Sequence, residues 1–125
     1  MQKNILIVFA LFIAIIAHSQ SEEKLTQKDE KVLDMIASLP EVVRADKYII
    51  KVTNHQRHLE TYIDSKPTKQ DNRYWLTVAE NNGINLVPHF KFFVDAKTYV
   101  ISYWDVSNDK TIPLRVWRAH HYYAN

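Results

Sequence analysis

The sequence predicts an α+β domain, in which one or two N-terminal helices pack on a four-stranded antiparallel meander and a short helix ends the chain. Three observations predict this class. Apolar residues first recur at helical spacing in the 125-residue chain, which indicates an amphipathic helix. Apolar and polar residues then alternate with period two, as in strands that bury one face. Near the C-terminus a helical pattern returns, and no linker or internal repeat divides the chain.

The N-terminal helical pattern is expected to be followed directly by a second helix. The apolar positions of the first helix are Val32, Leu33, Ile36 and Leu39. Thr26 is a suitable N-cap residue. Ser38 and Glu41 have the spacing of a capping box, with Pro40 in the first turn, so the second helix is expected to begin near Ser38. Residues 41–52 also alternate in part like a strand; both alternatives stay open there, and the cap favours the helix.

Four strands are expected, over residues 59–65, 73–80, 85–94 and 99–106. Gly83, the only glycine, lies in a turn between the second and third strands, because Asn and Gly adopt positive φ at little cost. Asp95 leads a four-residue turn between the third and fourth strands. A turn of this length pairs Phe92 with Ile101. It places the following side chains on the helix-covered face: Phe90, Phe92, Tyr99, Ile101 and Tyr103.

The first nineteen residues have the features of a signal peptide. Lys3 supplies a positive start, residues 5–17 are apolar, and Ala17 and Ser19 are small residues at the positions that a signal peptidase reads. The thirteen-residue apolar run is shorter than the roughly twenty residues that span a membrane. We therefore expect export to the periplasm or the cell exterior, membrane contact only through the signal segment before cleavage, and one domain over residues 20–125. An uncleaved N-terminal anchor is the alternative.

Charge and cysteine content exclude several classes of protein. Without Lys3, one of the 16 basic residues is lost, and the remaining 15 face 14 acidic ones. A chain so close to neutral is not expected to bind nucleic acid, whose phosphates require a basic surface. The absence of cysteine excludes disulfides and a cysteine-linked lipid anchor.

At "FFVDAKTYVI" the sequence resembles the PepSY family of small exported α+β domains. Val94, Asp95 and Thr98 match the family's valine-aspartate-x-x-threonine-glycine turn, in which Tyr99 replaces the glycine. The upstream pieces agree in order over roughly residues 26–104: a helix ending near "SLPEV", a "YWLTV" strand and an "NNG" turn. The resemblance implies a binding or inhibitory module, since some such domains accompany secreted peptidases as parts of propeptides. It implies no catalytic residues.

The residues that could carry chemistry form no complete motif. On a helix, the spacing of His55 and His58 could present both rings to one metal ion, but no third ligand has motif spacing nearby. There is no cysteine nucleophile, no GxSxG elbow and no glycine-rich phosphate loop. We therefore predict no catalytic residue, metal site or cofactor. A small secreted metal-binding protein or enzyme that uses His55, His58 or His89 is the alternative.

The face of the sheet opposite the helix-covered face is the predicted partner-binding surface. Its predicted residues are Trp75, Lys91, Phe93 and Trp104, on neighbouring strands. Aromatic anchors dominate protein interfaces, and exposed apolar patches mark them. We expect a protein or peptide partner in the cell envelope to bind this face, or to pair with a sheet edge. Two alternatives stay open: the C-terminal helix covers the face with Leu114 and Trp117, or a second copy covers it in a self-associating structural protein of the envelope, as a homodimer.

Overall fold

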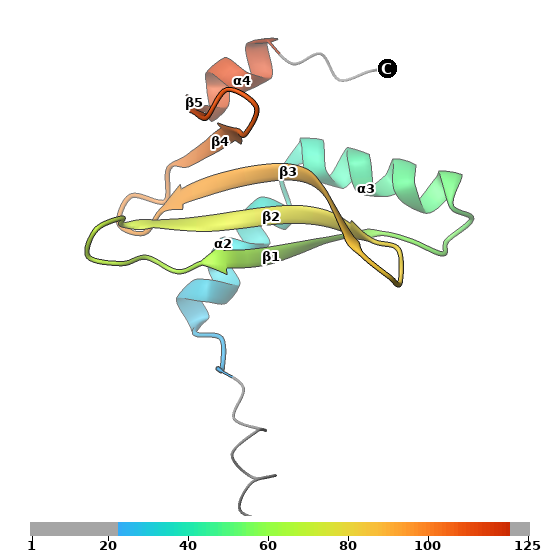
Figure 1. Cartoon of the computed structure of the whole chain (residues 1–125), viewed down its shortest axis with the longest axis horizontal. Coiled ribbons are helices and arrows are strands. Elements are labelled where there is room, and N and C mark those ends of the chain that lie inside the picture. Colours follow the sequence, from blue (N-terminus) through green and yellow to red (C-terminus); the bar gives the residue numbers. More distant parts are fainter. Residues whose placement is uncertain (1–22, 121–125) are drawn as a thin grey trace, which may run out of the picture.

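The computed structural model describes residues 23–120, so the predicted signal segment lies outside the described residues. The elements are α2 (Gln27–Ala37), α3 (Pro40–Val52), β1 (Leu59–Ser65), β2 (Arg73–Asn81), β3 (Leu86–Asp95), β4 (Ile101–Asp105), β5 (Lys110–Pro113) and α4 (Leu114–His120). The strands form one antiparallel sheet in sequence order, which Figure 1 shows from β1 to β5. The predicted α+β class is confirmed, with five strands in place of four. Within residues 23–120, no helix is long and apolar enough to cross a membrane.

α2 begins where its sequence predicts. The Thr26 hydroxyl accepts a hydrogen bond from the Asp29 N–H at 3.1 Å, and the Asp29 carboxylate accepts one from the Thr26 N–H at 3.0 Å. These reciprocal bonds satisfy two helix N–H groups that have no partner inside the helix. The helix then buries Val32 and Ile36 completely against the sheet.

Residues 40–52 form a helix, but the capping box predicted at its start is wrong. Leu39 is the N-cap of α3 and makes no side-chain cap, while Pro40 occupies the first turn. The Ser38 hydroxyl instead donates to the carbonyl oxygen of Asp34 in the preceding helix. Glu41 is buried and accepts hydrogen bonds from Arg118 of α4, so its carboxylate joins two helices rather than capping one.

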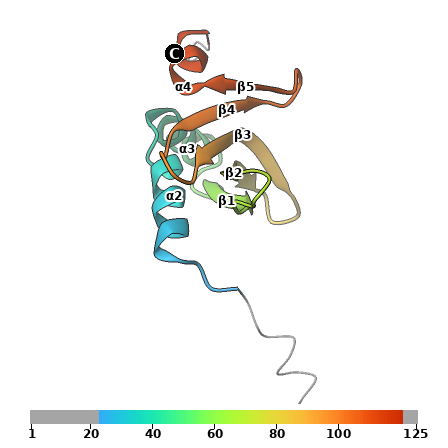
Figure 2. The same ribbon diagram turned by 90° about the vertical axis from the view of Figure 1, so that its left-hand side faces the viewer.

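All three described helices lie on one face of the sheet, which we call the core face. Figure 2 shows α2, α3 and α4 beside this face of the strands. Trp117 of α4 is only 3 % exposed and packs edge-on against Phe92 with ring centroids 5.7 Å apart. The other buried apolar side chains of this core are Val32, Ile36, Leu39, Val42, Ile49, Leu59, Tyr74, Leu76, Val78, Phe92, Val94 and Ala96.

The β3–β4 register differs from the expected one by two residues. Phe92 lies opposite Tyr103, and Val94 lies opposite Ile101. The four-residue turn is displaced by one position, from residues 95–98 to residues 96–99, because the Asp95 N–H donates to the Val100 carbonyl at 3.0 Å; β4 begins at Ile101. A shift of two residues preserves which side of the sheet each side chain faces. The predicted core assignment is therefore confirmed: Phe92 is buried, and Phe90, Tyr99, Ile101 and Tyr103 pack against the core.

β5 lies between the last expected strand and the C-terminal helix, where no strand was expected. Its four residues pair with β4, with Ile112 opposite Tyr103. Pro113 ends this strand and directly precedes α4. The strand adds Ile112 to the core face and provides the short connection that brings α4 back over β4 and β5.

Candidate functional site: the open face of the sheet

The sheet face opposite the helices, which we call the open face, carries all four residues predicted to bind a partner. Trp75 of β2 lies directly opposite Phe93 of β3, and Phe93 lies opposite Ser102 of β4. Lys91 and Trp104 follow at the next positions of the same parity on β3 and β4. Strand pairing thus brings together residues that are up to twenty-nine positions apart in the sequence.

Three of these residues form a compact group of rings, which we call the three-ring cluster. The ring centroids of Trp75 and Phe93 are 5.6 Å apart, those of Phe93 and Trp104 are 5.4 Å apart, and those of Trp75 and Trp104 are 5.7 Å apart. Trp75 meets Phe93 edge to face, a geometry that aromatic rings favour. Phe93 is 4 % exposed, whereas both tryptophans are half-buried. Phe93 therefore supports the cluster, and Trp75 and Trp104 are the rings that a partner can touch.

Polar contacts hold the three-ring cluster in place. The Arg73 guanidinium lies 4.0 Å from the centre of the Phe93 ring. Asp71 accepts hydrogen bonds from Arg73, at 2.8 and 3.1 Å, and from the Trp75 indole N–H at 2.8 Å. The bond from Arg73 holds the pKa of Asp71 below its usual value, and the bond from Trp75 acts in the same direction. Because Arg73 and Trp75 are fixed by one carboxylate, little rotamer entropy remains to be lost when a partner binds.

One alternative from the sequence was that the C-terminal helix covers the open face. The structure contradicts this alternative. Leu114 and Trp117 both belong to the core on the opposite side of the sheet. In the part of the chain that the structure describes, the open face has no helix above it. Trp75 and Trp104 are accordingly not part of a second core closed by α4.

A hollow of about 370 Å³ lies on the open face beside Lys91. It is lined by Tyr62, Asp64, Thr77, Ala79, Leu86, Pro88 and Lys91. Most of its surface is apolar, and Leu86, 51 % exposed, stands at its side. The volume falls within the range of about 300–1,000 Å³ that is typical of ligand sites. We call it the open-face hollow.

One wall of the open-face hollow is a polar group of three side chains. The Lys91 ammonium donates a hydrogen bond to the Thr77 hydroxyl at 3.0 Å, and that hydroxyl donates to the Asp64 carboxylate. The ammonium nitrogen and the Asp64 carboxylate are 3.8 Å apart. Lys91 also lies 5.7 Å from the centre of the Trp104 ring. Lys91 therefore joins the hollow to the three-ring cluster, and the two features form one site.

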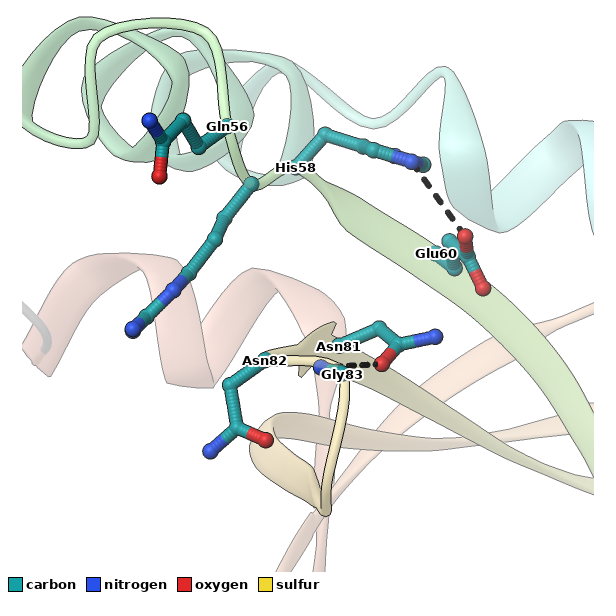
Figure 3. A pocket seen from close by; sticks show the side chains of 7 residues that line it. Gln56, His58, Glu60, Asn81, Asn82 and Gly83 are labelled. Carbon is teal, nitrogen blue, oxygen red and sulfur yellow. Dashed lines mark hydrogen bonds and ion pairs between the residues drawn. The ribbon is translucent and has the colours of Figure 1, made fainter.

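A second, more polar hollow of about 380 Å³ lies at the end of the sheet near the β2–β3 turn (Figure 3). It is lined by Gln56, Arg57, His58, Glu60, Asn81, Asn82 and Gly83. Its ionic groups already have partners: His58 is 3.2 Å from Glu60, and Arg57 is 3.2 Å from Glu80. The hydrogen bond from Arg57, followed by that from His89, lowers the pKa of Glu80.

The structure does not bring the three candidate histidines together. His55 lies in the turn after α3 with a φ of 64°, His58 contacts Glu60, and His89 contacts Glu80 at 3.2 Å. Among residues 23–120, no group of three or more His, Cys, Asp or Glu side chains could hold a metal ion. The histidine alternative therefore has no converging set of ligands in the described part of the chain.

The sequence reasoning missed the residues of the open-face hollow, such as Asp64, Thr77 and Leu86. Alternation had placed Asp64 and Thr77 away from the core, which was a usable signal. Their contact depends on the β1–β2 register, which shifts at a bulge between Ile63 and Ser65. A second irregularity lies opposite Val78 and Ala79, where β3 has one extra residue. Pro88, which cannot donate to the ladder, was a usable sign of the irregularity in β3, a strand with a neighbour on each side.

Comparisons with protein-family models, curated proteins and solved structures find no match to this chain.

Proposed function

We propose that this protein is an exported, non-catalytic binding module that holds a protein or peptide partner of the cell envelope on its open face. The observation that carries the proposal is the juxtaposition of the three-ring cluster and the open-face hollow on a sheet face that no described helix covers. Trp75 and Trp104 would be the anchors, Lys91 would lie between cluster and hollow, and Phe93 would support the rings from beneath.

The chemistry of the surface supports a protein partner. The two indole N–H groups already donate inside the protein, Trp75 to Asp71 at 2.8 Å and Trp104 to Asp109 at 3.3 Å. The indoles therefore offer apolar ring surface without polar groups that need new partners. Half-buried tryptophans held in fixed positions are typical hot spots of interfaces, where truncation to alanine costs about 2 kcal/mol or more of binding free energy.

The β3–β4 turn supports the proposed kinship with PepSY-like domains. Tyr99, which stands where that family has glycine, has a φ of 59°, in the left-handed region that glycine favours. The Asp95 carboxylate accepts hydrogen bonds from the N–H groups of Lys97 and Thr98, both at 2.8 Å. The turn thus has the backbone that an aspartate-x-x-threonine-glycine sequence would adopt. A binding or inhibitory role is what that kinship implies.

Capture from the native envelope tests the proposal. The bait is the purified protein, compared with the variants Leu86→Glu and Leu25→Glu. Both replace a leucine that is about half exposed, 51 % and 47 % respectively, but only Leu86 lines the open face. We expect Leu86→Glu to lose the captured partner and Leu25→Glu to retain it. If Leu86→Glu and Trp104→Ala, both still folded, capture the same partner as strongly as the unaltered protein, the open face is not the binding surface.

A further inference from the structure

We infer that the open-face hollow receives a bulky apolar side chain from the interior of a partner polypeptide, while Lys91 and Asp64 bind the uncharged peptide groups next to that side chain. The inference rests on the proposed function, because it names the chemistry that a partner presents to the open face. It concerns one subsite, beside the three-ring cluster rather than within it.

The bed of the hollow selects an apolar group. Ala79 and Pro88 face each other across β2 and β3, and Leu86 continues the same surface towards the turn. Tyr62 closes the β1 side, and its hydroxyl donates to Glu60. The ring of Tyr62 is therefore left for apolar contact. Leu86 is 51 % exposed, and the lining of the hollow is largely apolar. Both features favour the burial of a hydrophobic side chain of the partner in this hollow.

The polar wall has hydrogen-bonding capacity to spare. An ammonium group carries three N–H donors, and within residues 23–120 the Lys91 ammonium makes one hydrogen bond, to Thr77. The Thr77 hydroxyl bonds one oxygen of Asp64, and the other oxygen accepts no hydrogen bond from the described residues. The hollow thus offers free donors on Lys91 and a free acceptor oxygen on Asp64; the Lys91 ammonium lies 3.8 Å from the other Asp64 oxygen, the one that Thr77 bonds.

Charge complementarity then identifies the group that fits. A carboxylate next to Lys91 would also face the carboxylate of Asp64, and an ammonium next to Asp64 would also face Lys91. A group with any net charge therefore gains from one neighbour and loses to the other. A peptide group carries an N–H donor and a C=O acceptor without net charge, so it satisfies both neighbours. The occupant is accordingly an internal peptide segment, rather than a chain terminus or a fatty acid.

Titration with short peptides tests this subsite. The three probes are pentapeptides of glycine with one phenylalanine: at the centre with both ends capped, at the C-terminus with a free carboxylate, or at the N-terminus with a free amine. The isotope-labelled protein is followed by NMR at the amides of Thr77, Ala79 and Lys91. We expect the capped peptide to bind most tightly, by about threefold or more over either charged peptide, given two opposite charges at similar distances. Decanoate serves as the fatty-acid probe.

Two variants sharpen the result. Leu86→Glu should abolish the shifts caused by the capped peptide, whereas Leu25→Glu should leave them unchanged. Asp64→Asn should strengthen binding of the free-carboxylate peptide relative to the capped one, because the repelling charge is removed. The inference is overturned if the carboxylate peptide or decanoate binds best, if no saturable shift occurs, or if Asp64→Asn leaves the ranking of the peptides unaltered.

These outcomes separate the subsite from the proposed function. If the protein binds the three peptides equally well but envelope capture depends on Leu86, the subsite is overturned and the proposed binding module still holds. If the peptides discriminate but envelope capture is insensitive to both Leu86→Glu and Trp104→Ala, the subsite chemistry is supported and the proposed function is contradicted.

Discussion

Trp117 of α4 stacks on Tyr103 of β4, with ring centroids 4.6 Å apart and ring planes at 13°. Tyr103 points towards the core face, so this contact places the C-terminal helix on the same side of the sheet as α2 and α3. Trp75 and Trp104 on the open face remain half-buried in the described structure. The tryptophans on the two faces thus have different roles: Trp117 closes the core, and the other two are available to a partner.

Replacing Trp117 with alanine should destabilise the fold far more than replacing Trp104. Trp117 is 3 % exposed and contacts Phe90, Phe92 and Tyr103, so Trp117→Ala should lower the free energy of unfolding by about 3–5 kcal/mol. Trp104 is half-buried, and its loss removes ring contacts of about 1 kcal/mol on top of a smaller buried area. Urea unfolding of the two variants measures the difference. Equal losses of stability would mean that the three-ring cluster is a second core.

Acid should destabilise the protein in part through Asp29. This carboxylate is 2 % exposed; the Thr26 N–H, followed by Lys66 at 3.0 Å and the Tyr74 hydroxyl at 2.9 Å, lowers its pKa to about 2. Because the pKa of Asp29 is lower in the folded than in the unfolded state, its ionised carboxylate stabilises the fold at pH values above its ordinary pKa of 3.8. This contribution is lost as the pH falls towards 2. The loss amounts to about 2 kcal/mol.

The variant Asp29→Asn isolates this contribution. Its unfolding free energy, measured by urea titration between pH 6 and pH 2, should fall less steeply with acid than that of the unaltered protein. Asp34→Asn, at an exposed position of the same helix, is the matched control and should retain the steep fall. A steep fall that persists in Asp29→Asn would contradict the assignment.

At position 99, glycine should be more stabilising than alanine. Both substitutions remove the Tyr99 ring, including its contact with the Lys31 ammonium 3.9 Å from the ring centre. Only glycine also relieves the strain of a side chain at a φ of 59°, which is worth about 1 kcal/mol. Thermal or urea unfolding of Tyr99→Gly and Tyr99→Ala compares them directly. If alanine proves equal or better, the turn is not the glycine-type turn that the PepSY resemblance implies.

Alternation could predict the face of most strand residues but not of those at the start of β3, where a bulge places Leu86 and Pro88 on the open face although they share the parity of the core residue Phe92. The contacts within each face could not be predicted. Period-two alternation placed Trp75, Phe93 and Trp104 on one side, and it tolerated an error of two residues in the β3–β4 register. The register itself depended on the left-handed conformation of Tyr99, a residue for which that conformation is uncommon.

Other features depended on long-range contacts, for which the local signal in the sequence was weak or misleading. β5 has four residues, too few to show a period, and its pairing with β4 is a long-range property. The Ser38–Glu41 spacing favoured a capping box, but burial of Glu41 beside Arg118 of α4 determined where its side chain lies. The open-face hollow depends on two bulges and on the exposure of Leu86, which only the folded sheet defines.

Oxidative footprinting of tryptophan and tyrosine side chains tests most directly whether the open face is covered by a partner. Hydroxyl radicals are generated in the native envelope and in a dilute solution of the purified protein, and the rates of modification of Trp75, Trp104 and Tyr48 are compared by mass spectrometry. Tyr48, 64 % exposed on α3 and away from the open face, is the internal control. We predict that Trp104 and Trp75 react at least about threefold more slowly in the envelope, because hot-spot rings are shielded from water in a complex, while Tyr48 reacts equally in both. Equal reactivity of the two tryptophans in envelope and solution would contradict the open face as the binding surface.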